Sequence, residues 1–144
     1  MKLLTLGLVI GLHVTAAAAD GVVTYAISDS FADATFAVEN AIIGKGLVID
    51  YVSHTGEMLA RTKADVGGAK DLFAAADVFL FCSASLSRQV MEADPMNIAH
   101  CPYGIFVADQ AGEVIVGYRQ MPEGAMQEVQ VLLDEIAREA AGVE

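Results

Sequence analysis

Basic residues are scarce in this chain of 144 residues. Eight lysines and arginines stand against 19 aspartates and glutamates, which gives a formal net charge of −11 at pH 7. A surface of this sign repels nucleic-acid phosphates and anionic membranes, so neither is expected as a partner. A basic protein partner or cations would suit the charge, and a second interpretation is that the acidity only keeps the protein soluble.

The common catalytic signatures are also missing. The sequence has no Ser/His/Asp arrangement, no phosphate-binding loop and no evident pair of carboxylates. Gly44-Lys45-Gly46 follows a predicted helix, whereas a phosphate loop precedes one. We therefore predict no catalytic residues, and a non-enzymatic protein is the favoured expectation.

Long hydrophobic runs are limited to the N-terminus. Leu3–Leu12 follows a lysine and is short for a membrane-spanning helix, and Ala17–Ala19 supplies the small residues that signal peptidase accepts. We predict a signal peptide over residues 1–19, cleaved after Ala19, and a single periplasmic or secreted domain over residues 20–144. The alternative is an N-terminal membrane anchor. No later run is long enough to span a bilayer, so no stable membrane insertion is expected after cleavage.

Hydrophobic periodicity predicts the elements of that domain. Strands are predicted at Val22–Ile27, Leu47–His54, Asp77–Cys82, Ile105–Ala108 and Glu113–Tyr118. Helices are predicted after Ser30, over Glu57–Lys63, at Asp71–Ala76, over Ser83–Glu92 and from Pro122 onward. The order predicts an α+β fold, an antiparallel strand meander with helices packed on one face.

Side-chain spacing predicts which faces are buried. In the second strand, alternation places Ile49 and Tyr51 on one face, and in the helix that follows Met58 is expected to turn inward. The last helix is predicted to bury one stripe of residues. These residues are Met126, Val129, Leu133, Ile136 and Ala140.

Soft and borderline metal ligands are concentrated in Phe81–Tyr103. This segment holds the two cysteines, Cys82 and Cys101, and also His100. It further includes two methionines, Met91 and Met96. Since Cys82 ends one predicted strand and Cys101 precedes the next, the two residues would lie together if these strands are antiparallel neighbours.

A disulfide between Cys82 and Cys101 is the simplest interpretation for an exported chain with two cysteines. It would close a loop of about 20 residues and contribute about 3 kcal/mol. The extended backbone that Pro102 imposes on Cys101 should direct its sulfur at the start of the Ser83–Glu92 helix.

The competing interpretation is a thiol-redox protein, or one that handles a soft metal or haem. Cys82 immediately precedes a predicted helix, whose dipole would favour the thiolate. Cys82, Cys101 and His100 could ligate copper or haem, although their spacing matches no standard metal-binding signature.

Three segments resemble the bacterial family called domain of unknown function 302. They are FADATFAVENAIIGKGLVIDYVSHTGEML, FCSASLSRQVMEADPMNIAHCPYGIFVAD and VIVGYR, and they extend over most of the predicted domain. The resemblance implies a TATA-binding-protein-like α+β fold of order β-α-β-β-(α)-β-β-α, and a possible homodimer. It implies no activity. His100 departs from the pattern, since an apolar residue would be unremarkable there.

Overall fold

The computed structural model describes residues 17–19 and 21–143, which form one antiparallel sheet with helices. The sheet has the strand order β1-β2-β6-β5-β4-β3. Its strands are β1 (Ala17–Ala19), β2 (Val22–Ile27), β3 (Val48–Ser53), β4 (Ala75–Cys82), β5 (Tyr103–Gln110) and β6 (Glu113–Arg119). The predicted α+β meander is confirmed. Most of the predicted signal peptide lies outside the described residues.

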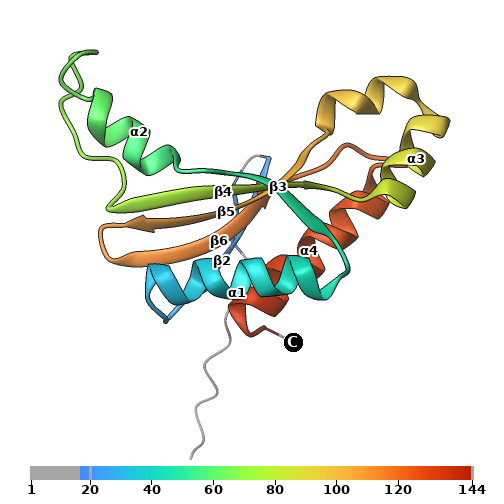
Figure 1. The fold of residues 1–144 in the computed structure, drawn as a ribbon, viewed down its shortest axis with the longest axis horizontal. Helices are drawn as coiled ribbons and strands as arrows, with labels where there is room; N and C mark the ends of the chain where they lie inside the picture. The colour runs from blue at the N-terminus through green and yellow to red at the C-terminus, as the bar shows by residue number, and fades with distance from the viewer. Residues whose placement is uncertain (1–16, 20, 144) are drawn as a thin grey trace, which may run out of the picture.

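The helices divide between the two sides of the sheet. α1 (Phe31–Gly44) and α4 (Gln127–Ala141) cover one face. α2 (Thr55–Thr62) rises beyond one end of the sheet, and α3 (Ala84–Ala93) with the 3₁₀ helix η1 (Pro95–His100) rises beyond the other (Figure 1). Within the described residues, no helix is long and apolar enough to cross a bilayer.

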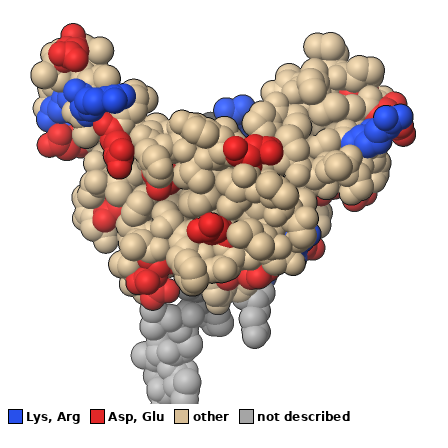
Figure 2. Space-filling view, in the orientation of Figure 1, with Lys and Arg blue, Asp and Glu red and all other residues tan. Residues whose placement is uncertain are grey.

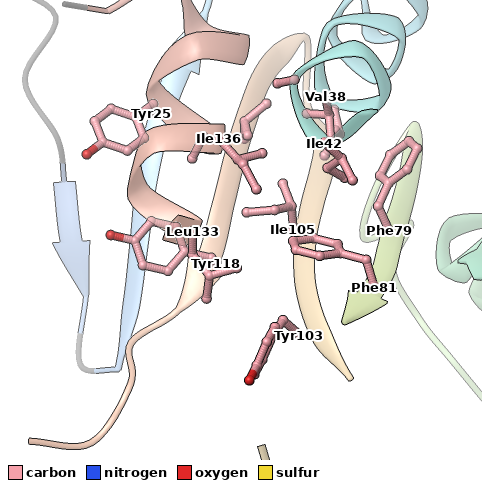
Figure 3. Close-up of a cluster of buried hydrophobic side chains, with 14 of the residues drawn as sticks. Tyr25, Val38, Ile42, Phe79, Phe81, Tyr103, Ile105, Tyr118, Leu133 and Ile136 are labelled. Carbon is pink, nitrogen blue, oxygen red and sulfur yellow. The ribbon is translucent and has the colours of Figure 1, made fainter. Parts of the chain in front are cut away.

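The hydrophobic core lies between the sheet and the pair α1 and α4 (Figure 3). Phe81 and Ile105 from the central strands meet Ile42 of α1 and Leu133 and Ile136 of α4, and all five are fully buried. Burying each such side chain contributes about 1.5–3 kcal/mol. The stripe predicted for the last helix is confirmed, with Ala140 partly buried at its end.

The helix ends follow from local sequence. The Ser30 hydroxyl accepts a hydrogen bond from the Asp33 backbone N–H at 3.2 Å, which caps α1. Ser83 caps α3 by accepting from the Leu86 N–H at 3.4 Å. These caps satisfy amide groups that have no partner inside a first helical turn.

One predicted helix is absent, and the predicted start of another is wrong. Asp71–Ala76 is not helical, because the Ala74 N–H donates to the Asp109 carbonyl at 2.8 Å and Ala75 already pairs with Asp109 in the β4–β5 ladder. α4 begins at Gln127 rather than at Pro122, because Gly124 adopts φ 90° and interrupts helical backbone.

Two predicted side-chain placements are also wrong. A bulge at Asp50 shifts the register of β3, so Tyr51 does not share a face with Ile49: Ile49 and Val52 pack on the core, and Tyr51 is 63% exposed. Met58, predicted to turn inward, is 42% exposed.

Candidate functional site

The two cysteines lie side by side at one end of the sheet. Cys82 is the last residue of β4, and Cys101 stands two residues before β5. These strands are antiparallel, with Phe81 opposite Tyr103. The Cys82 and Cys101 sulfurs are 2.8 Å apart, closer than unbonded sulfur atoms normally approach. The predicted meeting of the two residues is therefore confirmed.

Hydroxyl groups lie next to the pair. The Ser87 hydroxyl is 3.9 Å from the Cys101 sulfur and 3.0 Å from the Tyr103 hydroxyl. Since Ser87 lies in the first turn of α3, the Cys101 sulfur is directed at the start of this helix, as predicted. Tyr103 is 1% exposed, and its burial raises the pKa of its hydroxyl.

The surroundings of Cys82 oppose the thiolate that the helix dipole would favour. Burial raises the pKa of the Cys82 thiol to about 12, and the neighbouring Cys101 and the charge of Asp50 act in the same direction. The dipole of α3 does not reverse this, because Ser83 separates Cys82 from the helix and occupies its N-cap. As a thiol, Cys82 is therefore a poor nucleophile at neutral pH.

His100 lies at the end of η1, and no shared metal site joins it to the cysteines. In residues 17–19 and 21–143, no three His, Cys, Asp or Glu side chains are close enough to hold one metal ion. Met91 packs on the core, while Met96 is 70% exposed. The structure thus brings Cys82 and Cys101 together without a third ligand, and copper or haem binding stays a prediction.

A cavity of about 380 Å³ opens on the sheet face that α1 and α4 leave uncovered. Residues from β2, β4, β5, β6 and η1, with neighbouring loop residues, form it. They are Val22, Val78, Leu80, His100, Pro102, Gly104, Phe106, Arg119 and Met121. In the space-filling view, this side of the sheet is hollowed between the two lobes that α2 and α3 form (Figure 2). Since His100 and Pro102 flank Cys101, the cysteine pair adjoins the cavity.

Gly117 fixes the position of the Phe106 ring in this cavity. The two residues face each other across β5 and β6. A Cβ on Gly117 would come within 2.6 Å of the Phe106 ring and 2.5 Å of the Val23 carbonyl oxygen. The Phe106 ring therefore occupies the space that a side chain at position 117 would need, which only glycine permits.

The sequence analysis did not find the cavity. The available signal was the apolar character of both faces of β4, where Phe79 and Phe81 point to the core and Val78 and Leu80 point away from it. This pattern is typical of a strand covered on both sides. Because α1 and α4 cover only one face of the sheet, the apolar residues on the other face of β4 remain open to solvent. The sequence does not reveal this, since it does not show which face the helices cover.

A carboxylate that accepts two tyrosine hydroxyls was also missed. Tyr25 and Tyr118 donate to the same oxygen of Asp134 at 2.5 and 2.7 Å. Burial, and then the hydrogen bond to Asp134, raises the pKa of Tyr25 to about 12 and that of Tyr118 further. The cluster ties α4 to β2 and β6, away from the cavity.

His54 has a structural partner on the surface. Its Nδ1 is 2.8 Å from an Asp77 carboxylate oxygen. This hydrogen bond raises the pKa of His54. His54 thus joins the start of α2 to β4 and is no part of the cysteine site.

Fold and site together define a small α+β domain whose single sheet has one covered and one open face, with a cysteine pair at the sheet end. The model of the family described as Domain of unknown function DUF302 matches residues 23–142, so the chain belongs to this family, as the resemblance implied.

The same fold is found among solved structures. An example is the crystal structure of the uncharacterized conserved protein DUF302 from Bacillus stearothermophilus, with a TM-score of 0.62 and 14% sequence identity. The match covers 86% of this chain and 95% of that one. A search of curated proteins found no significant match to this chain.

Proposed function

We propose that this chain is an exported, non-enzymatic binding domain that uses the open sheet face, with a Cys82–Cys101 disulfide fixing the wall beside its cavity. The observation that carries the proposal is the 2.8 Å separation of the two sulfurs, directly beside cavity residues His100 and Pro102. A bond between them would tie the η1–β5 junction to the end of β4. The cavity would then keep its shape without a ligand, which lowers the cost of binding.

The raised pKa of Cys82 supports a structural rather than a catalytic role for the pair. Burial and the neighbouring Cys101 raise the pKa of the Cys82 thiol, and a thiol with a raised pKa is a poor nucleophile at neutral pH. Export, which rests on the N-terminal sequence alone, would supply the oxidising compartment in which the bond persists.

Thiol titration of the protein purified from periplasm tests the disulfide. The unfolded, unreduced protein should show no free thiols, and two after reduction. Two thiols before reduction would contradict it. Native mass spectrometry of the same sample gives the mass of the mature chain, which locates its N-terminus. Any added mass would identify bound copper or haem, a second copy of the chain or a basic protein partner.

Backbone amide NMR tests the binding role. Small-molecule fragments added to the oxidised protein should shift the amide signals of Gly104 and Phe106, which line the cavity. Amide signals of α2 residues, beyond the end of the sheet, are the control. A diverse fragment set that leaves the cavity signals unmoved would contradict a binding role for this face.

A second candidate, a thiol-redox protein, is favoured by the half-buried Cys101 with the Ser87 hydroxyl 3.9 Å from its sulfur. In such a reaction the two thiols would lose two electrons and two protons to a partner disulfide. The products are the Cys82–Cys101 bond and two partner thiols. Equilibration with glutathione separates the candidates, since a structural bond resists reduction at potentials where a redox-active pair exchanges.

A further inference from the structure

The cavity on the open sheet face combines an apolar floor with two nitrogen-bearing side chains. We propose that it binds a small amphipathic carboxylate, whose apolar body lies on Val78, Leu80 and Phe106 and whose carboxylate meets Arg119 and His100. The inference rests on the proposed binding function and specifies the chemistry of its ligand.

The floor suits an apolar body. Val78 and Leu80 of β4 and Phe106 of β5 point away from the core and line the cavity. All three are only partly buried, because neither α1 nor α4 covers this face. The volume of about 380 Å³ lies within the ~300–1,000 Å³ typical of small-molecule sites, which are mostly apolar with a few convergent polar groups.

Arg119 supplies the charge complementarity. It is exposed at the end of β6, and none of the described carboxylates forms an ion pair with it. Lys45, Lys63 and Arg88, by contrast, are paired with acidic side chains. A guanidinium presents a planar fork of donors that matches the two oxygens of a carboxylate.

The lining of the cavity contains no acidic residue, although the chain is strongly acidic. At physiological ionic strength, exposed charges are largely screened beyond about 8 Å. A carboxylate in the cavity therefore experiences Arg119 more strongly than distant acids. His100 can add a ring N–H donor, which gives a role to the residue in which this sequence departs from its family pattern.

Gly104 offers a variant that narrows the cavity without disturbing the fold. A Cβ at this position would lie 3.4 Å from Leu80 Cδ2 and 3.5 Å from Val78 Cγ1, which are ordinary contacts. Gly104→Ala therefore places a methyl group on the cavity floor. By contrast, alanine at Gly117 would collide with the Phe106 ring and with backbone.

Calorimetric titration of the oxidised protein tests the proposal with decanoate, 2-naphthoate and the neutral 2-naphthamide. At least one carboxylate should bind, and naphthoate should bind tenfold or more tightly than naphthamide if the aromatic body is preferred. The tighter of the two carboxylates shows whether the apolar body is a chain or a ring. If decanoate is tighter, its neutral match, decanamide, should bind at least tenfold more weakly.

Three variants locate the interaction. Arg119→Gln should weaken carboxylate binding at least tenfold, whereas Arg88→Gln, the same charge change outside the cavity, should change it less than twofold. Gly104→Ala should weaken binding of the carboxylate and of its amide alike. Failure of both carboxylates to bind, or equal effects of the two arginine variants, would overturn the proposal.

The amide NMR signals of Gly104 and Phe106 separate this proposal from the binding function on which it rests. If neutral probes move these signals and carboxylates show no preference, the cavity is a binding site for another ligand class and only the present inference fails. If no probe moves them, both fail.

Discussion

At the scale of single residues, the clearest polar interaction is Asp134 with its two tyrosines. One carboxylate oxygen accepts hydrogen bonds from Tyr25 and Tyr118, whose side chains are 5% and 2% exposed. The residues lie up to 109 positions apart, so no local pattern predicts their meeting. In the sequence, Tyr25 and Tyr118 are two of four tyrosines, and no neighbouring residue links either of them to Asp134.

Asp134→Ala should lower the free energy of unfolding by about 2–3 kcal/mol. The substitution leaves two buried hydroxyls without their acceptor, and hydrogen bonds to charged groups contribute about 1.5–3 kcal/mol. Glu135→Ala is the control, because it removes only the exposed pair with Lys45, worth about 0–1 kcal/mol. Urea melts measure both, and equal effects would contradict the role assigned to Asp134.

The same cluster predicts a pH dependence. Tyr25 ionises near pH 10 in the unfolded chain and near pH 12 in the folded protein, so the unfolded state binds fewer protons between these values. Stability should therefore fall as the pH rises from 10 to 12, and less steeply in Tyr25→Phe. Ionised tyrosine absorbs near 295 nm. The absorbance that the unaltered protein shows in excess of Tyr25→Phe should therefore rise near pH 12. A difference that titrates at pH 10 would contradict the prediction.

At the scale of elements, a tight turn joins β5 to β6. Gln110 pairs with Glu113, which leaves Ala111 and Gly112 as a two-residue turn with φ 57° and 87°. Positive φ at both positions is typical of a type I′ turn, where Asn-Gly is strongly preferred. Alanine tolerates this conformation poorly, because its Cβ crowds the backbone.

Ala111→Asn should therefore raise the free energy of unfolding by about 0.5–1 kcal/mol, since asparagine adopts positive φ at lower cost. Ala111→Val should lower it, because a β-branched side chain disfavours this conformation most. Thermal melts of the three proteins provide the measurement. A valine variant as stable as the asparagine variant would argue against the turn.

The attachment of α2 depends on Gly56. A Cβ there would lie 2.5 Å from the Ala76 backbone nitrogen, so the helix packs directly on the β4 backbone. Gly56→Ala should lower stability by about 1–3 kcal/mol through overpacking, despite the better helix propensity of alanine. Gly104→Ala, whose new contacts are ordinary, is the matched control. The backbone amides of α2 should exchange their hydrogens faster in Gly56→Ala and at an unchanged rate in Gly104→Ala.

At the scale of the whole molecule, the proposed disulfide would join two chain segments that the sheet brings together. Cys101→Ser should lower stability by about 3 kcal/mol, Cys82→Ser by a similar amount, and the double variant by no more than either, because one bond is lost in all three. Denaturant melts with and without reductant measure this. If the unaltered protein is equally stable with and without reductant, the proposed disulfide is contradicted.

The amino-acid sequence by itself determined most of the architecture. Period-two and helical spacings placed β2, β4, β6, α1 and α3 within one or two residues, because one-sided burial imposes these periods. The meeting of Cys82 and Cys101 followed from the same strand order.

Only the tertiary structure decided which apolar faces stay open. α1 and α4 both pack on one face, so Val78, Leu80 and Phe106 remain at the cavity, and Arg119 joins them from the end of β6. It also raises the pKa of the Cys82 thiol, because burial outweighs a helix start nearby. Both outcomes depend on which segments exclude water from a residue, and those segments are distant in sequence.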